Sequence, residues 1–564
     1  MLDILVRGGL IVDGTGNPPY PGDVAISGGR IVALGRLEGA KATTVIDAGG
    51  LAVAPGFIDM HSHSDLSLPL HPKASSSLSQ GITTEVAGSC GWSLAPVKKE
   101  TAGSVLRGLC EGLMGEVPGG LDAESGEGAP GLGWYSFDQY LEHIENQGMG
   151  VNLYPIVGQS LLRAHVVGTD RRPATPGEIR AMQELLVACL AEGARGLSTG
   201  RAYLPGAGAS IEEIIALAKV VAASGGIYTS HLKDESSGVV DAVAEAIRIG
   251  RESGVRVEVS HHKAIGRANF GRVAETLAMM EDARRSGVDV TCDVYPYSFA
   301  QVFSLLTEIP GISPSQSDDE VRVLLAQEEF RQKTVDQLLK ACASENGTPG
   351  FLSRPEHIML ISLGASHELE GQPLASVMGG FALLPSGPSA PAVGAPDPAT
   401  LRALVDRLLD FLLEQDLRVN LAAIMAEEDV VAVLGQAETM VGTDAFTLDR
   451  ELGGRTPIHP RHYGTFPRVL GHYGRDKGLG GLAPMVQKVS GLPARKLCLA
   501  DRGLLAPGMS ADVVVFDPGT IADRATAKSP YLESIGIGWV IVNGLVAAKD
   551  GRPTDARAGM VLRR

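Results

Sequence analysis

Hydrophobic and polar positions alternate in two different ways along this chain of 564 residues. Near both ends, short apolar runs are separated by Gly, Asp and Asn, as at residues 4–6, 30–34, 511–516 and 539–544. Short runs bounded by turn residues predict β-strands joined by tight turns. Because the two ends share this pattern, we expect both to contribute to one small β-sandwich domain, residues 1–52 as one part and residues 498–564 as the other.

The middle of the chain alternates strand-like apolar runs with amphipathic helical segments. Strands are predicted at residues 52–59, 81–87, 152–157, 196–198, 227–230, 256–260 and 288–292, with a last one just before Asp444. Helices are predicted between them, for example at residues 176–192, 211–224, 239–253 and 270–286. Eight strands of one style separated by helices favour an α/β fold, a (β/α)₈ TIM barrel spanning residues 53–497.

Two stretches do not follow this alternation. Residues 103–133 are rich in Gly and Glu, and residues 299–399 contain two segments rich in Pro, Ser and Gly. The second stretch would leave the barrel after its seventh strand, and loops that follow barrel strands lie at the catalytic face. We therefore expect a long insertion that covers the barrel mouth as a lid, with a plain surface insert as the alternative.

Composition narrows the classes of function. The chain carries 49 basic and 65 acidic residues, a formal net charge of −16, without a basic cluster, which argues against nucleic-acid and anionic-membrane partners. No apolar run approaches the roughly 20 residues of a membrane span, and the N-terminus does not resemble a signal peptide. The six cysteines lack paired spacing, so we expect a reducing, cytoplasmic setting and a small-molecule partner. The oligomeric state is left open.

Potential metal ligands recur where the expected strands end. His61 and His63 lie two apart on one strand and therefore point to the same face. Others follow the second, fifth, sixth and last strands: Cys90, His231, His261 and Asp444. Taken singly, a cysteine is usually a buried hydrophobe, a histidine a satisfied polar group and an Asp a helix cap. Together at one face, they predict a metal site, and this ligand set suits zinc.

The chain resembles the amidohydrolase superfamily, and within it the D-aminoacylase (N-acyl-D-amino-acid deacylase) group. The resemblance runs nearly from end to end and is carried by segments 55–65, 88–93, 193–200, 203–206, 260–263, 293–297, 459–468, 501–503, 508–512 and 542–544. It implies a metal-dependent hydrolase of linear amides with a barrel and a terminal β-sandwich. Two positions depart from the family pattern, Ser89 in place of an asparagine and Gln159 in place of a histidine.

The resemblance also assigns roles. It implies one tightly held Zn²⁺ on Cys90, His231 and His261, while His61, His63 and Asp444 surround it and offer a second, weaker position. Matching family positions hold the substrate carboxylate, and here these are Lys263, Tyr295 and Arg461. The alternatives are a solvated charge for Lys263, a packed loop residue for Tyr295 and a salt bridge to the lid for Arg461.

The expected reaction is hydrolysis of an N-acyl-D-amino acid by an activated water. We take Asp444 as the general base, the alternative being a purely structural ligand. The segment after Tyr297 has no Lys or Arg to bind a second carboxylate, which favours an apolar side chain. Preference for the D form rests on the resemblance alone. Alternatives are a D-residue dipeptidase, a cyclic-amide hydrolase of the hydantoinase type, or a non-catalytic scaffold.

Overall fold

A computed structural model describes residues 1–98, 134–168, 170–312, 316–343, 355–378, 398–452 and 457–563. Among these residues, no helix has both the length and the hydropathy needed to cross a membrane. The stretch at residues 103–133 lies outside the described residues.

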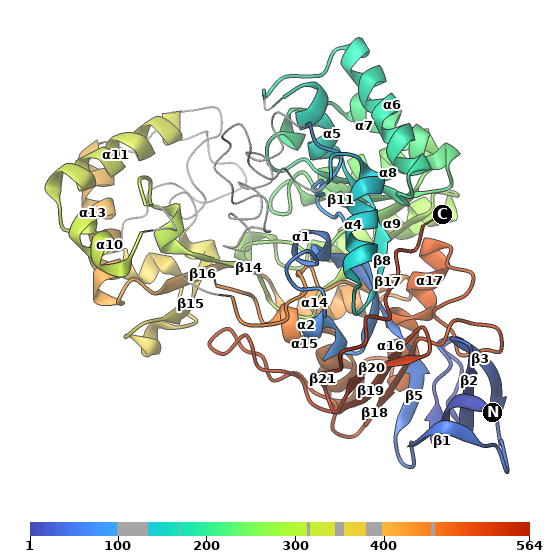
Figure 1. Ribbon diagram of the computed structural model, residues 1–564. Helices are drawn as coiled ribbons and strands as arrows, with labels where there is room; N and C mark the ends of the chain where they lie inside the picture. Colours follow the sequence, from blue (N-terminus) through green and yellow to red (C-terminus); the bar gives the residue numbers. More distant parts are fainter. Residues whose placement is uncertain are drawn as a thin grey trace.

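Strands from the two ends of the chain belong to one nine-stranded sheet (Figure 1). Its strands are β1 (Leu2–Ile11), β2 (Tyr20–Ser27), β3 (Arg30–Gly35), β4 (Ala42–Asp47), β5 (Ala52–Pro55), β18 (Val513–Phe516), β19 (Ile537–Val542), β20 (Leu545–Lys549) and β21 (Arg552–Pro553). The two ends meet where β5 pairs in parallel with β1 and antiparallel with β18. The expected joining of both ends is therefore found as one sheet, whereas the sandwich and the domain boundaries remain predictions.

The strand predicted at residues 52–59 is in fact two strands, so this prediction was wrong. Residues of β5 pair with β18, while β6 (Phe57–Ser62) pairs with β7 (Ile82–Ala87) in a different sheet. The chain changes sheets at Gly56, where a Cβ atom would lie only 2.1 Å from Thr83 Oγ1. The crossing therefore depends on a residue without a side chain.

Parallel strands form the middle of the molecule. One sheet has the order β6, β7 and β8 (Asn152–Pro155). The other runs from β9 (Val157–Gly158) through β10 (Gly196–Gly200), β11 (Ile227–His231), β12 (Arg256–Val259) and β13 (Val290–Val294) to β17 (Thr439–Val441). Only Ile156 separates β8 from β9, and a parallel bridge between Ser62 and Ala445 links β6 to the segment after β17. All residues of β7, β10 and β13 are buried, as expected for parallel strands covered on both faces.

Helices follow the parallel strands as the sequence pattern predicts. They are α4 (Phe137–Gln147), α5 (Gln159–Val166), α6 (Pro176–Ala191), α7 (Ile211–Ala223), α8 (Val239–Ser253), α9 (Val273–Arg285), α14 (Glu427–Leu434), α15 (Arg461–Arg468), α16 (Leu482–Val489) and α17 (Gly491–Leu497), with the single turns α1 (Ser64–Ser67) and α2 (Ser75–Leu78). The start of α6 shows why the boundaries were predictable. Thr175 accepts a hydrogen bond from the Glu178 amide, and the Glu178 carboxylate accepts one from the Thr175 amide.

The insertion contains regular structure of its own, unlike the long loop expected from its Pro- and Ser-rich segments. An antiparallel sheet has the order β14 (Phe299–Ser304), β16 (Val419–Ile424) and β15 (Ile358–Leu363), accompanied by α10 (Asp318–Leu325), α11 (Glu328–Ala343) and α13 (Pro398–Glu414). Because β16 pairs with β14, the insertion extends to residue 424 rather than 399. It has a separate apolar core and projects from the main body (Figure 1). Residues 384–391, expected to be part of the lid, lie outside the described residues.

Candidate metal centre

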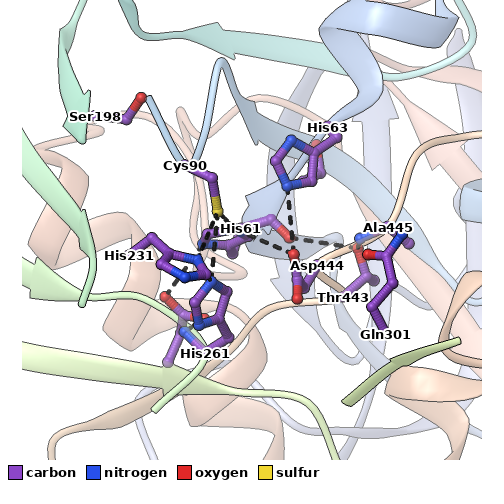
Figure 2. Close-up of polar contacts among 12 residues, drawn as sticks. His61, His63, Cys90, Ser198, His231, His261, Gln301, Thr443, Asp444 and Ala445 are labelled. Carbon is purple, nitrogen blue, oxygen red and sulfur yellow. Dashed lines mark hydrogen bonds and ion pairs between the residues drawn. The ribbon is translucent and has the colours of Figure 1, made fainter. Parts of the chain in front are cut away.

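Six side chains from distant parts of the chain meet at the carboxyl ends of the parallel strands (Figure 2). We call these residues the strand-end cluster: His61, His63, Cys90, His231, His261 and Asp444. They form two groups that share Cys90, one with His231 and His261, the other with His61, His63 and Asp444. Within each group, one potential ligand atom per residue lies within 4.8 Å of the others.

The first group has the dimensions of a metal site. Cys90 Sγ lies 3.6 Å from His231 Nδ1 and 3.4 Å from His261 Nε2, and these two nitrogens are 2.9 Å apart. Zn–N bonds of about 2.0 Å and Zn–S bonds of about 2.3 Å put tetrahedral ligand atoms roughly 3.3–3.6 Å apart. The two sulfur–nitrogen separations fall in this range, and the two nitrogens lie closer together than it. A thiol and two imidazoles are also ligands of the softness that zinc prefers.

The second group centres on Asp444. Its Oδ1 lies 3.4 Å from His61 Nε2 and 3.3 Å from His63 Nε2, while His61 Nε2 also lies 3.2 Å from Cys90 Sγ. In Figure 2, Asp444 lies below His63 and to the right of Cys90 and His231. Asp444 is therefore placed where it can contact both a metal ligand and a bound water.

Three cluster residues adopt backbone conformations that side chains usually avoid. Cys90, His261 and Asp444 have φ values of 54°, 36° and 51°, in the left-handed region. For residues other than glycine this conformation costs about 1–2 kcal/mol. The backbone turns sharply where each strand ends, and the turn directs the side chain toward the centre. Such strain is concentrated at functional sites because the surrounding fold must impose it.

Burial determines the protonation states of the histidines and the cysteine in the cluster. It lowers the pKa of His61 to about 4 and that of His261 to about 3, and it also lowers the pKa of His231, so all three imidazoles are neutral and can bind a cation. Burial, with the charge of Asp444 adding to it, raises the pKa of the Cys90 thiol well above its usual value. A cation is therefore needed to hold Cys90 as a thiolate.

Asp444 is ionised because the Arg461 guanidinium lies beside it. Burial alone would raise its pKa, but Arg461 and the neighbouring imidazoles hold the pKa well below its usual value. Arg461 Nη1 lies 2.7 Å from Asp444 Oδ2, and Arg461 Nη2 donates to Gln301 Oε1 at 3.1 Å. Arg461 Nε is buried and has no hydrogen-bond partner among the described residues.

The other two residues expected at the substrate carboxylate lie next to the cluster. The Tyr295 ring lies below both cations, 4.8 Å from the Arg461 guanidinium carbon and 5.5 Å from Lys263 Nζ. Lys263 Nζ, however, donates to Glu235 Oε1 at 2.6 Å and to the His261 carbonyl at 2.7 Å. The structure thus brings all three predicted residues to the site, with the Lys263 ammonium bound to protein groups.

Three carboxylates that support the cluster were not identified from the sequence. Glu235 contacts His261 and Lys263. Asp59 accepts hydrogen bonds from the His61 amide at 3.1 Å and the Thr443 amide at 2.9 Å, which ties β6 to the segment bearing Asp444. Asp293 accepts from the His261 amide at 2.8 Å. Asp59 and Asp293 are acidic residues inside strands in which every residue is buried, and a charge in a predicted buried strand was the available signal.

Gln159, one of the two departures from the family pattern, lies in a buried ionic network. Its Nε2 donates to Glu213 Oε1 at 2.9 Å, and Glu213 also pairs with the fully buried Arg163. An amide satisfies this carboxylate without adding a second cation. This hydrogen bond connects α5 to α7.

A cavity of about 780 Å³ opens beside the cluster. Strand β11 and the segment after it contribute His231 and Glu235, and the insertion contributes His357, Ile358 and Ala423. The cavity therefore joins a candidate metal ligand to the insertion. Ile358 lies on β15 and Ala423 on β16, so two strands of the insertion form part of the cavity wall, and its role as a lid remains a prediction.

Comparisons with known proteins agree with this geometry. A sequence profile described as "Amidohydrolase family" matches residues 44–349. A protein named D-aminoacylase from Alcaligenes xylosoxydans xylosoxydans is 36% identical, over 100% of this chain and 98% of its own length.

Two solved structures extend the comparison. One, whose description reads "The functional role of the binuclear metal center in D-aminoacylase", is 36% identical with a TM-score of 0.72 and full coverage of both chains. The other, N-acyl-D-glutamate deacylase from Bordetella bronchiseptica complexed with zinc and a phosphonate inhibitor, is 33% identical with a TM-score of 0.73 and equal coverage. With strand ends, ligand types and full-length similarity in agreement, the chain belongs to the amidohydrolase family, within its D-aminoacylase group.

Proposed function

We propose that this protein hydrolyses N-acyl-D-amino acids with a metal ion held by the strand-end cluster. The observation that carries the proposal is the Cys90, His231 and His261 group, whose spacing suits zinc. One tight Zn²⁺ would bind there, and His61, His63 and Asp444 would offer a weaker second position. We also propose that the two parallel sheets close into one (β/α)₈ barrel, joined through the bridge between Ser62 and Ala445.

A bound divalent cation supplies two effects, a lower pKa for water and polarisation of the amide carbonyl. The chain itself supplies the proton acceptor. Asp444 is ionised and lies against both imidazoles of the second group, so it can take a proton from the attacking water. It can then return that proton to the departing amine nitrogen, since an amide leaves only when its nitrogen is protonated.

Arg461 is the principal candidate for the substrate carboxylate. It is 2% exposed, it lies 2.7 Å from the proposed base, and its Nε lacks a partner among the described residues. A guanidinium with a free N–H binds a carboxylate in a defined orientation. Tyr295 would fix the plane of the guanidinium through its ring, and Lys263 would add positive charge nearby.

The side chain of the amino acid would enter the cavity beside His231. Its lining includes the carboxylates Asp234, Asp241 and Glu245, with Lys233 as the one lysine or arginine among the lining residues. An acidic side chain would meet repulsion there, whereas Leu232, Ile265 and Ile358 offer apolar contact. We therefore propose N-acyl-D-amino acids with apolar side chains as the preferred substrates.

The test is a screen for amine release from N-acetyl amino acids by the zinc-loaded protein. N-acetyl-D-leucine and N-acetyl-D-methionine should be hydrolysed faster than N-acetyl-D-glutamate, and the L forms should react least. Dihydrouracil and dipeptides ending in a D-residue serve as controls for the cyclic-amide and dipeptidase alternatives. Release from these controls but not from N-acetyl-D-amino acids would refute the proposal.

A further inference from the structure

Glu235 occupies a buried position behind the metal-facing side of His261. It lies four residues beyond His231, after strand β11, and its side chain is 9% exposed. Its Oε1 lies 3.0 Å from His261 Nδ1 and 2.6 Å from Lys263 Nζ. One carboxylate oxygen therefore contacts a candidate metal ligand and a buried cation at the same time.

Lys263 favours the tautomer of His261 that cannot bind a metal through Nε2, unless a hydrogen-bond acceptor lies beside Nδ1. Lys263 Nζ lies 2.7 Å from His261 Nδ1, and an ammonium can only donate hydrogen bonds. If Nδ1 accepted from Lys263, the single proton of the neutral imidazole would lie on Nε2. That nitrogen faces Cys90 and His231, and an N–H there cannot bind a metal.

The Glu235 carboxylate favours the other tautomer, with the proton on Nδ1, because a carboxylate can only accept hydrogen bonds. Glu235 Oε1 lies 3.0 Å from Nδ1, so Nδ1–H can donate to it, and the Nε2 lone pair then points into the cluster. The ammonium also donates to Oε1 and to the His261 carbonyl, so it remains satisfied without Nδ1. The pair is neutral overall, which limits the cost of burying both charges.

We propose that Glu235 is a positioning residue that holds His261 in its metal-binding tautomer against the neighbouring Lys263. The inference rests on the proposed metal-dependent function. A consequence follows for the substrate: the Lys263 ammonium donates to Glu235 and the His261 carbonyl, whereas Arg461 keeps its Nε without a partner among the described residues, so Arg461 carries the contact with the substrate carboxylate.

The experiment compares the zinc affinities of four proteins by chelator competition: the native protein, Glu235→Gln, Lys263→Met and the double variant. Glu235→Gln should weaken zinc binding by about 10–100-fold, the usual effect of removing a group that orients a ligand. Lys263→Met should bind zinc nearly as the native protein does. The double variant should recover most of the lost affinity because no ammonium then competes for Nδ1. Cobalt(II) spectra of the same proteins report whether His261 stays a ligand.

Asp241→Asn is the matched control, because Asp241 lines the same cavity but lies on helix α8, outside the contacts of Glu235 with His261 and Lys263. It should leave zinc affinity unchanged. Native affinity in Glu235→Gln, or a double variant as weak as Glu235→Gln, would overturn the inference. If Glu235→Gln does not fold, Lys263→Met and the double variant must bind zinc within roughly threefold of each other, and a larger gap overturns it. Failure of the native protein to bind zinc would instead count against the proposed function.

Discussion

The strand-end cluster and the insertion meet at one cavity but are built differently. Cluster residues stand at the ends of parallel strands; His61, Cys90 and His261 are buried, and His63, His231 and Asp444 are partly exposed. At the cavity, by contrast, Ile358 and Ala423 belong to a separate three-stranded sheet that packs on its own apolar core. The cluster thus offers candidate ligands in fixed positions, whereas the insertion side of the cavity is formed by residues that pack on a different core.

This difference in construction suggests that the cluster determines the reaction and that the insertion determines which substrates fit. Asp59 and Asp293 accept hydrogen bonds from the His61 and His261 amides and so fix the backbone of the cluster, and a change there should disturb several cluster residues together. In contrast, His357, Ile358 and Ala423 reach the cavity from elements whose core is elsewhere. Substitutions in the insertion should alter which substrates fit, and substitutions in the cluster should alter whether any substrate reacts.

The largest effect is expected at Cys90. Replacing Cys90 with Ala removes the only soft ligand of the first group, and tight zinc binding and activity should both be lost. Zinc content by elemental analysis and amine release measure the two effects. Cys189→Ala is the control, because Cys189 is equally buried but lies on α6 outside both groups. Full zinc content in Cys90→Ala would mean that the ligand assignment is wrong.

A somewhat smaller loss is expected at Asp444. Asp444→Asn keeps the shape of the side chain but cannot accept a proton, so kcat should fall on the order of 10²-fold or more. Zinc bound to the Cys90 group should remain, because Asp444 belongs to the second group. Steady-state kinetics together with zinc analysis separates the roles. Near-normal kcat would place the general base elsewhere.

The sequence predicted the cluster because each ligand follows a short apolar run. Strand ends meet at one face in a parallel sheet, so the residue order alone brings His61, Cys90 and His231 together. The position of Glu235 could not be predicted in this way. It lies in a loop, where acidic residues are ordinary, and its partner Lys263 is distant in sequence, so only tertiary packing reveals the pair.

In the insertion, the sequence encodes regular structure that was not predicted from it. Its Pro- and Ser-rich segments drew attention to irregular structure, although residues 398–414 repeat Leu and Val at helical spacing. That spacing forms α13, whose Leu401, Leu404 and Leu408 are buried in the separate core of the insertion. The division of residues 52–59 between two sheets also escaped prediction, because a continuous apolar run does not reveal where its pairing partner changes.

A moderate and selective effect is expected from Ala423→Phe, which adds a ring to the insertion side of the cavity. Values of kcat/KM for N-acetyl-D-amino acids with large side chains should fall on the order of tenfold, while N-acetyl-D-alanine is little affected. Zinc content should not change. Val323→Phe adds the same ring to the exposed surface of α10 and should leave all substrates unaffected. An unaltered substrate ranking in Ala423→Phe would remove the insertion from the substrate pocket.

The smallest effect on catalysis is expected at Glu85, a buried residue of β7 that is hydrogen-bonded to Ser77 of α2, outside the cluster. Ser77 donates to its Oε1 at 2.7 Å, and its Oε2 has no hydrogen-bond partner among the described residues. Burial raises the pKa of Glu85 from 4.5 to about 7. The folded protein therefore keeps a proton that the unfolded chain releases between these pH values.

Because the folded state binds the additional proton, the Glu85 contribution to stability is full below pH 4.5 and is lost as the pH rises toward about 7. A shift of this size corresponds to on the order of 3 kcal/mol. Glu85→Gln cannot ionise, so relative to the native protein its free energy of unfolding should increase between pH 5 and pH 8. Urea titrations with equal zinc loading measure this difference, and the exposed Glu142→Gln on α4 should show none. A constant difference across this range would contradict the raised pKa. A large loss of kcat in Glu85→Gln would instead show that the strands supporting the cluster and the cluster itself cannot be separated.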